Sequence, residues 1–169
     1  MENRPIVLDT GPLLTYLAIR YLDSMHATKA RRNHVLGEIR GTFDEAEQER
    51  FLELMKQRTF TTAHVISEAL NLREASALSR EKEGFRRNSL EVLMGGAITE
   101  IACPIAEICK TEDFRQLICR YGLTDAGVVF VASNDRALVL TDDGRLFGSY
   151  SEDSGHVIAL LDDHLREPA

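Results

Sequence analysis

Short apolar runs of strand length alternate along the chain with longer stretches in which apolar residues recur every three or four positions. Ile6–Leu8 followed by Pro12–Leu22 predicts a buried strand that turns into a helix. Thr59–Thr62 is rich in β-branched and aromatic residues and predicts a second strand. Ala137–Leu140 predicts another buried strand, and His156–Leu161 a last one before a polar tail.

Helical patterns fill the intervals between these strands. The expected helices cover Met25–Ile39, Asp44–Arg58, a segment from Ala63 to Leu72, Phe114–Tyr121 and Asp125–Ala132. We expect Ser79–Arg87, a charged run broken by Gly84, to form a turn between helices. Cys103–Ile108 is expected to be a short extended segment.

Strands that alternate with helices predict an α/β protein, a three-layer α/β/α sandwich with a mostly parallel central sheet. The 169 residues fit a single domain over 1–169, without repeats or an interdomain linker. Hydrophobic residues make up 44% and charged residues 28%, which excludes disordered and fibrous classes. No apolar run approaches the roughly 20 residues that span a bilayer, so no membrane association is expected.

Cysteine usage favours a cytoplasmic protein. Cys103, Cys109 and Cys119 are odd in number and include no Cys-x-x-Cys pair, so neither a disulfide framework nor a zinc site is expected. The net charge of −7 counts weakly against nucleic acid as a partner. Acids that converge on metal ions would be neutralised locally, however, so the sign of the net charge does not decide the question.

Acidic residues follow the apolar strands or lie near the start of helices. These acids are Asp9, Glu68, Asp125, Asp142 and Asp143. Because parallel strands end at the same edge of a sheet, the expected topology gathers them in one crevice. Asp9, Asp125 or Asp142 could each be only a helix N-cap. Capping does not explain Glu68, which lies inside a predicted helix.

Carboxylates that lie close together repel and raise one another's pKa unless a cation compensates. Oxygen ligands without histidine or thiolate suit Mg²⁺ or Mn²⁺ better than Zn²⁺. Such ions can activate a water molecule and stabilise the departing oxygen in phosphodiester cleavage. The acids therefore predict a catalytic site that uses Mg²⁺ or Mn²⁺.

Four segments of the sequence resemble the motifs of PIN domains, the metal-dependent nuclease fold that includes the VapC toxins. They are IVLDTGPLL, HVISEALNL, YGLTDAGVVFVA and ALVLTDDGRLF, in the order in which the family has them. The resemblance matches Asp9, Glu68 and Asp125 to the family's three principal acids. It leaves the fourth open between Asp142 and Asp143. Thr10 is similar to the family's small hydroxyl residue, which orients a water or ligand as second shell, with helix capping as the alternative.

The resemblance implies an endoribonuclease that cleaves an RNA substrate with Mg²⁺ or Mn²⁺. It also implies, as open alternatives, a toxin held by an antitoxin-type protein inhibitor or a stand-alone PIN protein, because the Asp9–Glu68 and Ser79–Thr111 intervals are long. A homodimer is a further expectation. Phosphate contacts could come from Arg20, Arg32, Arg86, Arg87, Arg136 and Arg145.

Two other function classes are weighed against a nuclease. The first is a catalytically silent PIN-fold module that binds or scaffolds a partner, which the intact acids disfavour. The second is a phosphotransfer receiver domain, which would require a late lysine. No lysine follows Lys110.

Overall fold

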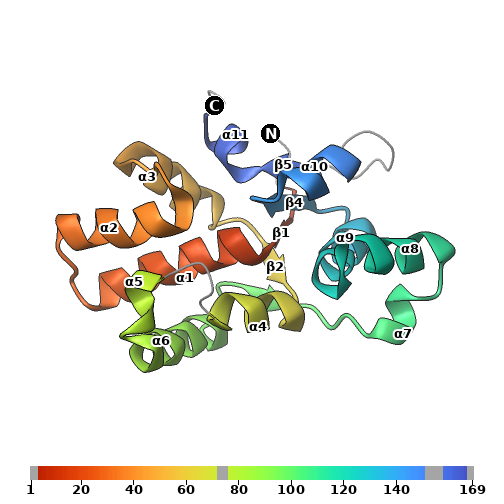
Figure 1. Cartoon of the computed structure of the whole chain (residues 1–169), viewed down its shortest axis with the longest axis horizontal. Coiled ribbons are helices and arrows are strands. Elements are labelled where there is room, and N and C mark those ends of the chain that lie inside the picture. Colours follow the sequence, from red (N-terminus) through yellow and green to blue (C-terminus); the bar gives the residue numbers. More distant parts are fainter. Residues whose placement is uncertain (1–3, 72–75, 151–157, 167–169) are drawn as a thin grey trace.

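A computed structural model of the chain describes residues 4–71, 76–150 and 158–166. In these residues, five parallel strands form one sheet in the order β3-β2-β1-β4-β5. The strands are β1 (Ile6–Leu8), β2 (Thr59–Thr61), β3 (Thr99–Glu100), β4 (Leu138–Thr141) and β5 (Ile158–Leu160). Helices flank the sheet, so the fold is the expected α/β/α sandwich (Figure 1).

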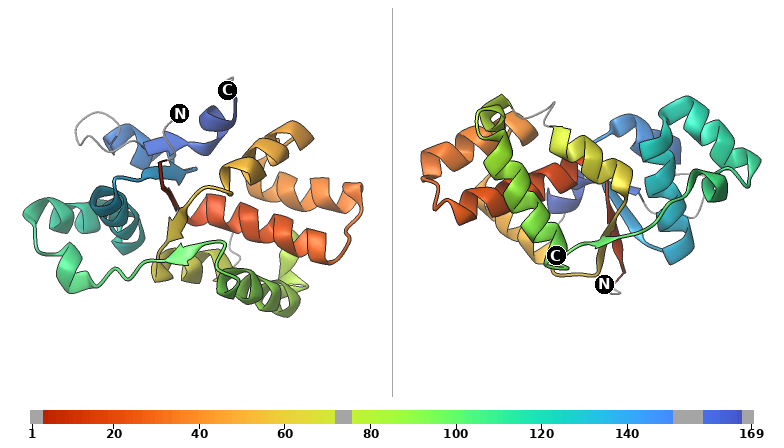
Figure 2. Two further views of the ribbon diagram at one scale, coloured as in Figure 1. Left: turned by 180° about the vertical axis from the view of Figure 1, so that it is seen from behind. Right: turned by 90° about the horizontal axis from the view of Figure 1, so that it is seen from below.

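Helices connect every pair of consecutive strands. They are α1 (Thr10–Ser24), α2 (Lys29–Arg40), α3 (Glu45–Leu54), α4 (Ala63–Asn71), α5 (Ser76–Ser79), α6 (Lys82–Met94), α7 (Ile105–Ile108), α8 (Glu112–Tyr121), α9 (Leu123–Asp135), α10 (Gly144–Tyr150) and α11 (Leu161–Arg166). Helices α1, α2 and α6 lie on one side of the sheet and α7, α8 and α9 on the other (Figure 2). Helix α4 contacts both α1 and α9.

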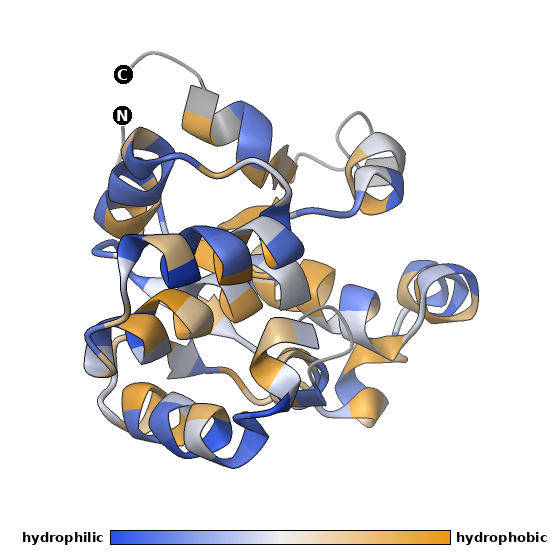
Figure 3. Ribbon diagram, turned by 60° about the vertical axis from the view of Figure 1, so that its left-hand side comes forward, coloured by the Kyte–Doolittle hydropathy of each residue, from blue (hydrophilic) through white to orange (hydrophobic). Residues whose placement is uncertain are grey.

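Strand β1 and helix α1 form the centre of the core. All three residues of β1 are buried, and ten of the fifteen residues of α1 are buried as well. Helix α1 packs against α2, α4 and α6, which explains why it is apolar around most of its circumference. Figure 3 shows that the outer helices alternate instead between hydrophobic and hydrophilic residues, as burial of a single face requires.

Strands β2 and β3 are added on one side of β1, and strands β4 and β5 on its other side. From β1 the chain crosses to β2 through helices on one face, whereas β4 lies on the other side of β1 and is reached through α7, α8 and α9. A crevice forms between the carboxyl ends of two such strands because the chains leave them on opposite faces. The β1–β4 boundary is therefore the part of the sheet where a ligand site is expected.

The structure corrects the prediction for Ser79–Arg87. Helix α6 begins at Lys82 and contains Gly84, so most of the expected turn is helical. Phe85 is fully buried and packs edge-on against the Tyr21 ring, which anchors the first turns of α6. A Cβ at position 84 would come within 3.1 Å of the Tyr21 hydroxyl. The glycine thus makes room for a neighbouring helix and does not break its own.

Two further predictions of local structure are wrong. Ile105–Ile108, expected to be extended, forms helix α7, and the neighbouring strand β3 lies earlier, at Thr99–Glu100. Both β3 residues are exposed at the sheet edge, so no buried apolar run marked this strand. Leu161, expected at the end of the last strand, instead begins α11, which buries both Leu161 and Leu165. The last strand is confirmed over Ile158–Leu160, while the first two residues of its predicted range lie outside the described residues.

None of the helices in the described ranges combines the length and the apolar composition needed to cross a membrane.

The central position of α1 predicts unequal costs for two leucine substitutions. Leu17 in α1 is fully buried and Leu90 in α6 is half exposed. Leu17→Ala should lower the free energy of unfolding by about 2–5 kcal/mol, because it leaves a cavity in the core. Leu90→Ala should change it by no more than about 0.5 kcal/mol. Urea denaturation followed by circular dichroism measures both, and equal effects would show that α1 is not central to the core.

Candidate functional site

A cleft of about 580 Å³ lies where β1 and β4 end. Its walls come from the β1–α1 junction, α4, the α8–α9 turn and the β4–α10 junction. All five acids expected from the sequence line it, namely Asp9, Glu68, Asp125, Asp142 and Asp143. The fold therefore gathers side chains from four separate regions of the chain into one acidic site.

Asp9 lies at the bottom of this cleft and is 7% exposed. It is the N-cap of α1, since the Thr10 backbone N–H donates to Oδ1 over 2.7 Å. The Thr141 hydroxyl donates to Oδ2 over 2.6 Å. Burial raises the pKa of Asp9, these two hydrogen bonds oppose the rise, and the charges of Asp142 and Glu68 add to it. Asp9 is thus both a helix cap and a cleft residue, so the two interpretations of its sequence position do not exclude each other.

Two threonine hydroxyls fix the carboxylate of Glu68. Thr10 donates to Oε2 over 3.0 Å, and Thr124 donates to Oε1 over 2.7 Å. These bonds join the starts of α1 and α9 to α4. Thr10 therefore contacts one of the expected site acids, while the N-cap of α1 is Asp9. Thr124 was missed, and its only signal in the sequence is its position directly before Asp125.

Asp125 lies in the first turn of α9. Burial raises its pKa to about 7, and the charges of Asp9, Asp143 and Glu68 contribute in that order. Gly122 places the residue here. Its φ of +101° ends α8 and lets the chain turn directly into α9, a backbone conformation that favours glycine.

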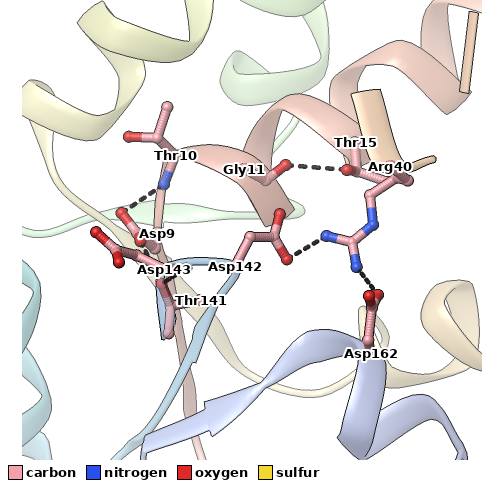
Figure 4. A network of polar contacts seen from close by, with 9 residues as sticks. All are labelled: Asp9, Thr10, Gly11, Thr15, Arg40, Thr141, Asp142, Asp143 and Asp162. Atoms are coloured by element: carbon pink, nitrogen blue, oxygen red, sulfur yellow. Dashed lines mark hydrogen bonds and ion pairs between the residues drawn. The ribbon is translucent and has the colours of Figure 1, made fainter. Parts of the chain in front are cut away.

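The adjacent acids Asp142 and Asp143 have different partners. The carboxylate of Asp143 accepts two hydrogen bonds from the Arg145 guanidinium, over 2.8 and 3.2 Å, which hold the pKa of Asp143 below its usual value. Arg145 is 82% exposed and lines the cleft. Asp142 instead pairs with Arg40, whose side chain is 3% exposed and also pairs with Asp162 (Figure 4). Both acids are partly exposed, and they differ in their partners: the arginine that binds Asp143 is exposed in the cleft and can be displaced by a ligand, whereas the arginine that binds Asp142 is buried.

Gly11 makes the position of Asp142 possible. A Cβ on Gly11 would overlap Oδ2 of Asp142, whereas the glycine lets the carboxylate lie directly against the start of α1. An alanine at position 11 would push Asp142 away or deform the first turn of the helix. The close approach of α1 to the β4–α10 junction thus explains a glycine that needs no unusual φ.

The basic residues of α2 are paired with acidic side chains of other parts of the chain. Lys29 pairs with Glu45, Arg31 with Glu81 and Arg32 with Asp23. Arg40, the last residue of the helix, is buried. Of the six arginines proposed for phosphate contacts, Arg145 lines the acidic cleft, and Arg86 donates to the Leu70 carbonyl over 3.0 Å.

The cleft provides oxygen donors that suit a hard cation. Among the described residues, no group of three or more histidine, cysteine, aspartate or glutamate side chains lies close enough together to hold a metal ion without rearrangement. Mg²⁺ does not require such a set, since it usually keeps several waters and takes one or two carboxylates. Burial, and after it the repulsion by neighbouring acids, raises the pKa of Asp125, and a cation would relieve that repulsion. Asp9, Glu68, Asp125 and Asp143 could hold it.

Neither the protein-family models nor the curated proteins nor the solved structures include a match to this chain. Membership of the PIN family therefore stays a prediction that rests on the four sequence motifs.

The raised pKa of Asp125 predicts how the stability of the metal-free protein depends on pH. Because the folded pKa of about 7 exceeds the ordinary value of 3.8, the folded state binds a proton that the unfolded chain releases. The resulting stabilisation is complete below pH 3.8 and is lost as the pH rises through about 7. We expect Tm to fall by roughly a few degrees between about pH 5 and pH 8, and Asp125→Asn to flatten this dependence.

Differential scanning calorimetry in the presence of a chelator measures this effect. Glu91→Gln, which alters an exposed acid on α6, serves as the control and should leave the profile unchanged. An Asp125→Asn profile as steep as that of the wild type would show that Asp125 titrates normally in the folded protein.

Proposed function

We propose that the chain is an endoribonuclease of the PIN type that hydrolyses RNA phosphodiester bonds with Mg²⁺ or Mn²⁺. The observation that carries the proposal is the cleft lined by Asp9, Glu68, Asp125 and Asp143, in which burial, with the charge of neighbouring acids added to it, raises the pKa of Asp9 and Asp125. Such an arrangement is unfavourable in a protein that binds no cation. The same residues are those that the motif resemblance assigns to catalysis.

These acids would hold the metal, and the other cleft residues would orient the acids and the substrate. A bound divalent ion would supply an activated water and neutralise charge on the scissile phosphate. Thr141 fixes Asp9, while Thr10 and Thr124 fix Glu68. The exposed guanidinium of Arg145 can leave Asp143 for a phosphate oxygen, which it would contact through two N–H groups.

The cleft also favours single-stranded substrates. Tyr121, the last residue of α8, lines the same cavity as the acids, and the Arg120 guanidinium lies 5.2 Å from the centre of its ring. Aromatic rings at such positions stack on unpaired bases, and the stacking tolerates any base. A duplex would not offer a base to this ring. We therefore infer that the RNA is cleaved in unpaired segments.

The catalytically silent binding module is the second candidate. It is less well supported, because a module without chemistry gains nothing from keeping repelling acids in one cleft. Within the nuclease proposal, a toxin with an antitoxin-type inhibitor and a stand-alone enzyme remain alternatives. A homodimer and a cytoplasmic location are further predictions.

Loss of the central carboxylate should abolish cleavage. Asp9→Asn keeps a side chain of the same shape that can cap α1, but it removes the charge. We expect cleavage of a fluorescent single-stranded RNA in Mn²⁺ to fall by at least about 10²-fold, with a circular dichroism spectrum like that of the wild type. Glu91→Gln should cleave normally. Equal cleavage by wild type and Asp9→Asn would assign the activity to a contaminant or to another site.

Calorimetric titration with Mn²⁺ separates the enzyme from the silent module. The wild type should release or absorb heat on binding, and Asp9→Asn should show a much smaller signal. Identical titrations would favour the module.

Substitutions of Tyr121 test the stacking contact. Tyr121→Phe keeps the ring and should retain KM for single-stranded RNA, whereas Tyr121→Ala should raise KM by about 5- to 100-fold. Turnover at saturating RNA should change little in both variants. A Phe variant as impaired as the Ala variant would show that the hydroxyl group, not the ring, makes the contact.

A further inference from the structure

Arg40 ends helix α2, yet both terminal nitrogens of its buried guanidinium are bound by carboxylates. One terminal nitrogen of its guanidinium donates to Oδ1 of Asp142 and the other to Oδ1 of Asp162 (Figure 4). The guanidinium also lies 5.7 Å from the centre of the Phe43 ring. Gly41, with a φ of +73°, ends α2 directly after it. A single side chain thus joins α2 to the β4–α10 junction and to α11.

The side chain of Arg40 is charged but only 3% exposed, and burying the charge costs desolvation free energy. An apolar residue could fill the same space without this cost, so stability alone does not explain an arginine here. The planar guanidinium offers a fork of donors, which allows it to bridge two carboxylates with a fixed geometry. Lysine, a point charge on a flexible stem, offers no such fork. The ion pairs of Arg40 with Asp142 and Asp162 therefore indicate that Arg40 fixes the positions of these residues more than it stabilises the fold.

Asp142 passes this restraint on to the acidic cleft. Its carboxylate is held between Arg40 and the start of α1, where Gly11 leaves room for it. The residues on either side of Asp142 are Thr141, which donates to Asp9, and Asp143, which faces Asp125 and Arg145. The Asp143 backbone N–H in turn donates to the Thr141 hydroxyl over 2.9 Å. Fixing Asp142 therefore fixes two neighbours that shape the site.

We propose that Arg40 is a positioning residue which, through Asp142, holds Thr141 and Asp143 in the geometry that the metal site requires. The proposal rests on the function proposed above and extends it to a residue that lines the far side of Asp142 and contacts no acid of the metal set. It also gives Asp142 a role other than that of a metal ligand. Residues that orient metal ligands typically change metal affinity or activity about 10- to 100-fold when they are altered.

The test compares Arg40→Met with Arg31→Met on the same helix. Arg31 is also partly buried in an ion pair, but its partner is Glu81, which does not line the cleft described above. Mn²⁺ affinity is measured by calorimetry, and kcat and KM are measured with single-stranded RNA, at a temperature where circular dichroism shows every variant folded. Arg40→Met should weaken Mn²⁺ binding and lower kcat by about tenfold or more, with KM unchanged, whereas Arg31→Met should change none of them.

A double variant tests whether Arg40 acts through Asp142. In an Asp142→Ala background, Arg40→Met should cause no further loss of Mn²⁺ affinity, because the intermediary is already absent. Additive losses would overturn the proposal, as would wild-type Mn²⁺ affinity in Arg40→Met or an equal loss in Arg31→Met. Failure of the wild type to cleave RNA would overturn only the proposed function, since the affinities still report on positioning. A wild type that binds no Mn²⁺ would overturn both.

Discussion

The pairing of β1 with β4 is the constraint on which the acidic cleft depends. Val7 lies opposite Val139 and Leu8 opposite Leu140, and the Asp9 backbone N–H extends the ladder by donating to the Leu140 carbonyl over 3.0 Å. This register sets the Thr141 hydroxyl beside the Asp9 carboxylate. A shift by one residue would turn every side chain of β4 to the opposite face and remove Thr141 from the site. The precision of the site thus comes from the sheet.

Two groups of side chains surround the paired ends of β1 and β4: the acids that line the cleft, and the residues that hydrogen-bond to acids there. Asp9, Glu68, Asp125 and Asp143 bring negative charge together in a cleft, and burial together with these neighbouring charges raises the pKa of Asp125. Threonine hydroxyls hold the carboxylates of Asp9 and Glu68 in place, and the buried guanidinium of Arg40 holds the neighbouring Asp142. Repelling carboxylates would otherwise move apart, since each gains hydration by doing so. The supporting contacts are therefore as necessary to the cleft as the acids themselves.

Sequence patterns predicted the parts of the fold that are buried and the parts of the site that lie at strand ends. Strands β1 and β4 follow from apolar runs and β2 from β-branched and aromatic residues, and Asp9 follows from its position directly after β1. Strand β3 carried no such signal, because it is exposed at an edge and only two residues long. Arg40 and Asp162 were missed because they are 122 residues apart and no local pattern relates them. The choice between Asp142 and Asp143 likewise depends on which side chain faces Arg40, a matter of tertiary contact.

The parallel topology also determines when the cleft can exist during biosynthesis. Its floor requires β1, which is made first, and β4, whose residues pair with β1 from more than a hundred positions further along the chain. Contacts so distant in sequence form late, after the intervening helices have been made and have closed the loop. A ribosome-bound fragment that ends before β4 lacks Thr141, Asp142 and Asp143. A nascent chain consequently cannot complete the cleft, or the metal site proposed for it, until β4 and the acids that follow it have been made.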